Sequence, residues 1–107
     1  MSLPKWISEP DALTGRALSV WNSYAPSAFK AGYLKAGNVE NFRMLVRLLA
    51  CADAAAAEIE TLGVSIEAKT GARRVNPAVS VLFSAQERAA KLLDEFGMAE
   101  DGSRFGL

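Results

Sequence analysis

Three basic side chains with the chemistry to bind phosphate lie close together between residues 64 and 75. They are Lys69, Arg73 and Arg74, and Glu67 is the single acidic residue of that stretch. Arginine binds phosphate through two parallel hydrogen bonds, and loops often carry binding residues. The stretch therefore predicts a nucleic-acid contact, while the ordinary alternative, a solvated loop with exposed charges, fits the same residues.

Two further lysines, Lys30 and Lys35, are the second choice for phosphate contact, because they lie in an N-terminal segment away from the apolar stripes. The chain has twelve basic and twelve acidic residues, so its net charge of zero gives no support to nucleic-acid binding. The distribution is uneven, however: residues 1–47 hold six basic and three acidic groups, and residues 48–107 hold six and nine. A dipolar chain can still present a basic face.

The sequence offers little chemistry for catalysis. It has no histidine, which removes the commonest metal ligand and general base, and it has neither a phosphate-binding glycine loop nor a nucleophile motif. Its one cysteine, Cys51, stands in an apolar helical setting typical of a buried thiol, and the absence of cysteine pairs indicates a reducing cytoplasm. Asp53 is expected to form a structural ion pair with Arg43, Arg47 or Arg88.

We therefore predict a protein without catalytic residues, without a metal site and without a cofactor. The apolar runs are interrupted by charge well before they reach about 18 residues, so no membrane span is predicted either. The remaining function classes are binding and assembly.

The elements that must position the basic residues are two long helices. The first is predicted over residues 38–62, with Asn38 as its N-cap and Gly63 at its end. The second is predicted from the Asn76 N-cap to Gly97, which can adopt the left-handed conformation that ends a helix. Apolar residues of the first helix recur at alternating steps of three and four, which is typical of a heptad seam. These positions are Phe42, Leu45, Leu49, Ala52, Ala56 and Ile59.

We predict an all-α fold in a single domain of residues 1–107. Its predicted parts are an extended arm over 1–10, N-terminal helices over 11–36, a helical hairpin over 38–97 that forms the oligomerisation core, and a tail over 98–107. The N-terminal part should hold a first helix from Asp11 to Tyr24 and a short helix over 26–34, because Pro26 ends one or starts the other. Residues 64–75, at the tip of the helical hairpin, fit a short β-hairpin and an irregular loop equally.

Each long helix is about as long as a compact domain of this size is wide. A helix of about 24 residues spans roughly 36 Å, and a compact globule of about 100 residues has a diameter of roughly 34 Å. Two short N-terminal segments cannot cover a helical pair that is apolar on several sides, so other copies of the chain should cover it. We therefore predict a homo-oligomer. The predicted interface residues are Phe42, Leu45, Leu49, Ala52, Ala56, Ile59, Leu82 and Leu93.

Several residues of the C-terminal half form an ordered combination. They are Asn76, Pro77, Ala78, Phe96, Gly97, Met98, Ser103, Arg104 and Leu107. The combination resembles the small terminase subunits of tailed phages, in which a helix opens with a His-or-Asn-Pro-Ala box, closes with a Phe/Leu-Gly-Leu/Met turn and precedes a Ser-Arg pair and a leucine. Upstream, Trp21, Tyr33, the alanine-rich helix and the Gly63 stop fit the same order, so the similarity covers about residues 12–107.

This resemblance implies a non-enzymatic, ring-forming subunit of the phage DNA-packaging motor, acting in the cytoplasm of the bacterial host. Such a subunit recognises double-stranded viral DNA at the packaging start site and delivers it to the large terminase subunit, which carries the ATPase and nuclease. The implied assembly is a cyclic homo-oligomer. Two alternatives stay open: a phage structural adaptor that oligomerises without touching DNA, and an enzyme on a helical scaffold.

Overall fold

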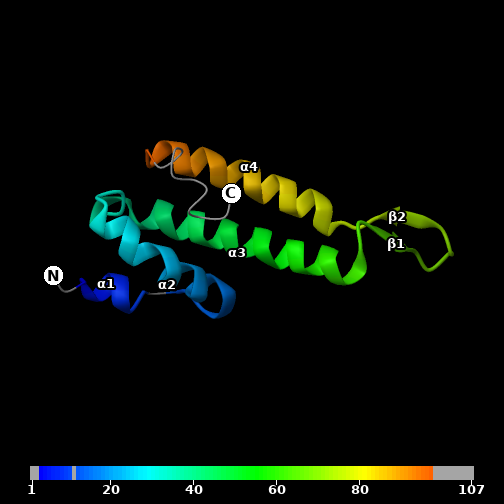
Figure 1. The fold of residues 1–107 in the computed structure, drawn as a ribbon, viewed down its shortest axis with the longest axis horizontal. Coiled ribbons are helices and arrows are strands. Elements are labelled where there is room, and N and C mark those ends of the chain that lie inside the picture. Colours follow the sequence, from blue (N-terminus) through cyan, green and yellow to red (C-terminus); the bar gives the residue numbers. More distant parts are fainter. Residues whose placement is uncertain (1–2, 11, 98–107) are drawn as a thin grey trace.

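Two long antiparallel helices, joined at one end by a β-hairpin, form the frame of the molecule (Figure 1). The computed structural model describes residues 3–10 and 12–97. The elements are α1 (Lys5–Ser8), α2 (Gly15–Lys30), the 3₁₀ turn η1 (Ala36–Asn38), α3 (Val39–Leu62), β1 (Ser65–Glu67), β2 (Arg73–Val75) and α4 (Ala78–Glu95). The radius of gyration is 16.1 Å and the extents are 58 × 26 × 19 Å. A compact chain of this length would have a radius of gyration near 13 Å, so the molecule is elongated.

Asn76 closes the joint between the two long helices. Its side-chain Oδ1 accepts a hydrogen bond from the amide of Ala78 at 3.0 Å, and its Nδ2 donates to the carbonyl of Gly63 at 2.9 Å. The residue is only 1% exposed. Gly63 adopts φ +89°, a backbone conformation that is unfavourable for residues with a side chain and that glycine adopts readily. It lets the chain turn sharply away from α3. The predicted stop at Gly63 and the predicted capping bond from Asn76 are confirmed. Helix α4 itself begins at Ala78, with Pro77 at the N-cap position, one residue later than predicted.

The segment between the long helices is a two-stranded antiparallel hairpin, so the β alternative for residues 64–75 is confirmed and the irregular loop is wrong. The register pairs Ser65 with Val75, Ile66 with Arg74 and Glu67 with Arg73. A two-stranded ribbon is marginally stable by itself. Here it is anchored at its base, where the amide of Asn76 donates to the carbonyl of Val64 at 2.7 Å.

The core lies at the end of the molecule away from the hairpin, where α1 and α2 pack against α3 (Figure 1). Trp21, Leu45 and Val46 are completely buried there. The ring of Phe42 lies edge-on to Trp21 and to Phe96, with ring centres 5.6 Å apart in both pairs. One hydrophobic cluster therefore binds α2, α3 and α4 together.

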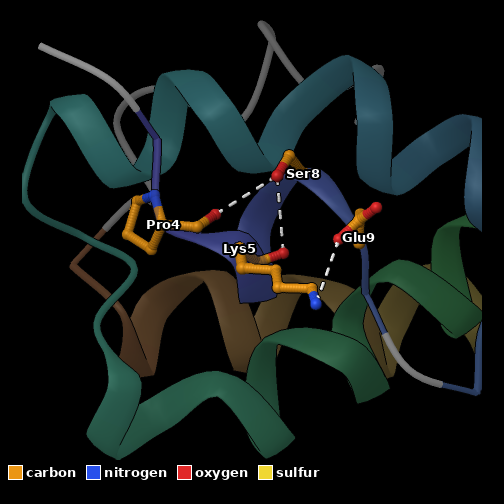
Figure 2. A network of polar contacts seen from close by, with 4 residues as sticks. All are labelled: Pro4, Lys5, Ser8 and Glu9. Carbon is orange, nitrogen blue, oxygen red and sulfur yellow. Dashed lines mark hydrogen bonds and ion pairs between the residues drawn. The ribbon is translucent and has the colours of Figure 1, made fainter.

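Residues 3–10 do not form the predicted extended arm, because residues 5–8 form the helical turn α1. Pro4 starts it, and the carbonyl of Pro4 accepts hydrogen bonds from the amides of Ile7 and Ser8 at 3.0 and 3.2 Å. Figure 2 shows the polar contacts of this turn, including the Lys5–Glu9 ion pair at 3.8 Å. The turn forms because it buries Ile7 to 1% exposure, and that burial offsets the ordering of a short segment.

The predicted break at Pro26 is also wrong, since α2 runs unbroken from Gly15 to Lys30. Proline inside a helix removes one backbone hydrogen bond and costs about 3 kcal/mol. The helix continues because Ala25 and Ala28, on either side of Pro26, are buried in the core. The start of this helix falls at Gly15 rather than near residue 11.

Asn38 does not cap α3 with its side chain. Its Oδ1 instead accepts from the amide of Lys35 at 2.8 Å, and its Nδ2 donates to the carbonyl of Tyr33 at 2.9 Å. The residue thus holds the turn η1 together, and α3 begins one residue later at Val39. The predicted boundary is correct to one residue, but the predicted capping contact is wrong.

At the other end of the helical hairpin, Gly97 has φ +74°, as its predicted role in ending the second helix requires. Its amide donates to the carbonyl of Asp94 at 3.0 Å. The predicted contact of Met98 and the predicted tail over 98–107 lie outside the described residues.

Candidate nucleic-acid interface

The tip of the β-hairpin carries the three basic side chains that we predicted to bind phosphate, and all three residues are exposed. Lys69 lies in the turn, which is closed by a hydrogen bond from the amide of Ala68 to the carbonyl of Ala72 at 2.7 Å. Arg73 and Arg74 follow in β2. Because neighbouring residues of a strand point to opposite faces, the two guanidinium groups leave the ribbon on different sides. The three charges therefore lie on more than one side of the hairpin.

Arg73 is partly engaged within the hairpin. Its Nη2 donates to the carbonyl of Ser65 at 2.9 Å, and its partner across the ladder is Glu67. An acidic residue directly opposite reduces the positive potential on that face. Three basic residues less one acidic residue leave a net charge of +2 between residues 64 and 75.

Arg74 lies on the face of the hairpin that turns toward the long helices. It lines a groove of about 420 Å³ together with Cys51, Glu58 and Val81. Within the described residues, the side chains of Arg74 and Lys69 make no hydrogen bond or ion pair. These two cations are therefore free to bind an anion.

Lys30 and Lys35 lie at the opposite end of the molecule from the hairpin tip. Lys30 ends α2, and Lys35 precedes η1, next to the beginning of α3. Both are exposed. The 24 residues of α3 separate them from the hairpin by about 36 Å. The structure therefore does not combine the two predicted basic groups into one site.

The residues predicted for the oligomer interface fall into two groups. Five of them are buried inside the single chain: Phe42, Leu45, Leu49, Ala52 and Leu93. Since they already pack against α2 and α4, they have little surface left for a second copy, and we assign them to the core of the chain. Ala56, Ile59 and Leu82 are half-buried and still offer some apolar surface.

The structure exposes a different set of large apolar side chains, which the sequence analysis missed. They are Met44, Leu62, Val64, Val75, Val81 and Phe83, each between 43% and 65% exposed. Leu62 ends α3, Val64 and Val75 lie at the base of the β-hairpin, and Val81 and Phe83 lie in the first two turns of α4. Of this set, Val81 also lines a groove between α3 and α4, and an exposed apolar side chain beside a groove is typical of an interaction surface. Their uneven distribution along the chain offers no periodic signal by which sequence could have found them.

Asp53 pairs with a different arginine from the three expected. Its Oδ2 lies 2.5 Å from Nη1 of Arg16, at the beginning of α2. Of the three expected partners, Arg43 pairs with Glu40, and Arg47 donates to the carbonyl of Ala12 at 3.3 Å. The ion pair therefore ties α2 to α3, and its structural role agrees with the expectation.

Cys51 also differs from expectation, because it is exposed and not buried. Within residues 3–10 and 12–97, no group of three or more acidic or cysteine side chains could hold a metal ion. None of the helices in this part of the chain is long and apolar enough to cross a membrane.

The fold and the exposed groups define a class: an elongated helical protein that presents basic and apolar surfaces for binding or assembly. The chain belongs to a particular family of that class, since the family model described as phage terminase, small subunit, matches residues 17–101. The sequence resemblance to small terminase subunits is thereby confirmed. Comparison with curated proteins and with solved structures gives no match. Members of this family are in general non-catalytic subunits of phage DNA packaging.

Proposed function

We propose that this protein is the small terminase subunit of a phage or prophage, and that it binds double-stranded viral DNA at the packaging start site. In this proposal it assembles as a cyclic homo-oligomer in the bacterial cytoplasm and regulates the large terminase subunit. The observation that carries the proposal is the family match over residues 17–101.

Contact with DNA is supported by the exposed cations of the hairpin tip. Lys69 and Arg74 lack partners within the described residues, and Arg73 lies beside them. A net charge of +2 on one hairpin is small, but a cyclic assembly repeats it once per subunit around a ring. Each phosphate neutralised adds about 0.9 to the magnitude of the salt slope on duplex DNA. Binding should therefore be strong only in the assembled form and should fall steeply with salt.

The proposal is tested by titrating the protein against duplexes from the phage genome ends, in a gel-shift assay at several salt concentrations. A scrambled duplex of equal length is the control. We expect retardation of both at low salt and tighter binding of the genome-end duplex. Absence of retardation at low salt, with the protein assembled, would rule out the DNA-binding role.

Regulation of the large subunit needs a second assay. Addition of this protein and genome-end DNA should change the ATPase or nuclease rate of the purified large subunit from the same phage. An unchanged rate, under conditions in which the two subunits associate, would remove the regulatory part of the proposal.

A structural adaptor that oligomerises without binding DNA is the second candidate. It is favoured by the zero net charge of the chain and by the engagement of Arg73 with Ser65. The gel-shift titration separates the two candidates, because an adaptor would assemble normally and leave DNA mobility unchanged at every salt concentration.

A further inference from the structure

Helix α4 exposes two apolar side chains on opposite sides at nearly the same height. Val81 is 43% exposed and Phe83 is 64% exposed. Successive helical residues are rotated by about 100°, so two residues two positions apart lie about 160° from each other around the helix. Their rise along the axis is only about 3 Å. Val81 and Phe83 therefore lie on opposite flanks of α4, at nearly the same position along its axis.

The flank that carries Val81 is hollowed. A groove of about 320 Å³ runs between α3 and α4, and small side chains make up most of its lining. Its principal lining residues are Leu48, Cys51, Val81, Ser84, Ala85 and Arg88. An enclosed cavity of about 150 Å³ is sufficient to hold benzene, so the groove has room for a phenyl ring.

The flank that carries Phe83 also carries Glu87, whose carboxylate forms an exposed ion pair with Lys91 at 3.7 Å. Glu87 follows Phe83 by four residues and thus lies on the same side of the helix, one turn further along. On the grooved flank the corresponding height is occupied by Arg88, which is exposed and has no ion pair within the described residues. Phe83 and Glu87 on one flank of α4 therefore lie at the same heights along the helix as the groove and Arg88 on the other flank.

We infer that Phe83 of one copy of this chain enters the groove between α3 and α4 of the next copy, with Glu87 of the first copy beside Arg88 of the second. This inference rests on the proposed assembly and names the surfaces by which the copies meet. Rotation about an axis that runs along the long helices preserves height. Phe83 therefore reaches the level of Val81 and Ser84 in the neighbouring copy without any shift along the axis.

The matching heights decide between two modes of association. Joining two different patches closes a ring only if successive copies are related by rotation without translation, and otherwise produces an open filament. Phe83 and the groove satisfy that condition, because they are one to two residues apart along α4. Because Phe83 and the groove lie on opposite flanks of α4, a two-fold dimer through either flank would cover one of them and leave the other exposed.

A pair of variants tests the inference by light scattering or native mass spectrometry. Phe83→Glu removes the raised side chain, and Cys51→Trp fills the groove from an exposed position, so neither change disturbs the core. We expect each variant to be monomeric where the unaltered protein is oligomeric. The control is Val75→Glu, which places the same charge at an equally exposed apolar residue on the face of the β-hairpin opposite Arg74. It should leave the assembly unchanged.

Mixing the two variants gives the sharper result. Phe83→Glu retains an intact groove, and Cys51→Trp retains an intact Phe83, so together they can form one good contact. We expect a one-to-one heterodimer and no larger species. A mixture that remains monomeric while both variants stay folded by circular dichroism would overturn the inference.

Disulfide trapping tests the same contact directly. Phe83→Cys should form a bond with the native Cys51 of the neighbouring copy when diamide is the oxidant, giving a ladder of covalent multimers on a non-reducing gel. The unaltered protein, with Cys51 alone, should give none. Efficient dimers of the unaltered protein would instead indicate a two-fold contact at Cys51 and would overturn the inference.

Failure of the inference can be told apart from failure of the proposed function. If the unaltered protein is a monomer at micromolar concentration, the proposed assembly fails and the contact fails with it. If the unaltered protein and Phe83→Glu form the same oligomer, only the contact is wrong. The gel-shift result remains an independent measure of DNA binding in both cases.

Discussion

The side-chain nitrogen of Asn76 donates a hydrogen bond to the carbonyl oxygen of Gly63 at 2.9 Å, and so joins the end of α3 to the beginning of α4. The opposite atom of the same amide accepts from Ala78. We expect Asn76→Ala to lower the free energy of unfolding by about 2–3 kcal/mol, because it removes a helix cap and leaves a carbonyl without its partner. Urea denaturation followed by circular dichroism measures the change.

A second variant, Asn76→Asp, separates the contribution of the bond to Gly63 from that of the bond to Ala78. A carboxylate keeps the acceptor for Ala78 but places an oxygen where Gly63 needs a donor. We expect a destabilisation of similar size in this variant, even though aspartate is a good N-cap residue. A variant as stable as the unaltered protein would show that the bond to Gly63 contributes little.

Phe42 connects α2 with the end of α4, since its ring contacts both Trp21 of α2 and Phe96, the residue that follows α4. It is buried to 1% exposure. We expect Phe42→Ala to destabilise the fold by about 3–5 kcal/mol through the cavity that it leaves. The control is Asn41→Ala, its exposed neighbour on α3, which should change the stability by less than about 0.5 kcal/mol.

The two arginines of β2 should account for part of the salt dependence of DNA binding. We expect the Arg73→Ala, Arg74→Ala double variant to bind genome-end DNA more weakly. The magnitude of its salt slope should fall by about 0.9 for each phosphate that the variant no longer neutralises. The matched control is Lys30→Ala, Lys35→Ala, which removes the same charge from the far end of the molecule. Unchanged binding by the arginine variant would exclude the hairpin from the DNA interface.

The ion pair between Arg16 and Asp53 should contribute little to the free energy of unfolding, although Nη1 and Oδ2 are only 2.5 Å apart. Both side chains are about half exposed or more, at 49% and 63%. Exposed pairs are typically worth less than about 1 kcal/mol, because water screens the charges. A double-mutant cycle with Arg16→Ala and Asp53→Ala should give a coupling below that value. A coupling energy of several kcal/mol would contradict this prediction, because it would mean that water does not screen the two charges.

Features encoded by neighbouring residues could be predicted from the sequence. Gly63, Gly97 and the Oδ1 atom of Asn76 act through backbone groups a few positions away, so these roles follow from local chemistry. The bond from Asn76 to Gly63 spans thirteen residues and was not predicted. Features that depend on distant parts of the chain could not be predicted. Residues 5–8 form a helix because Ile7 is buried, and α2 continues through Pro26 because Ala25 and Ala28 are buried. No local pattern reports that burial.

The same distinction applies to the candidate site. Lys69, Arg73 and Arg74 are close in sequence, so their clustering was evident before the structure. Their separation from Lys30 and Lys35, and the bond from Arg73 to Ser65, depend on the path of the chain and became visible only in the structure. Phe83 was missed because it lies outside the periodic apolar stripe of α4, and the stripe is the same with or without it.

Burial along α3 is uneven, since none of its residues after Ala55 is fully buried. Amide hydrogen exchange should therefore be slow in the first half of this helix and fast in its last two turns, when a single copy is observed alone. Contact with neighbouring copies would slow exchange there without altering the first half. The end of the molecule that carries Lys69, Arg73 and Arg74 would therefore become rigid only in the oligomer.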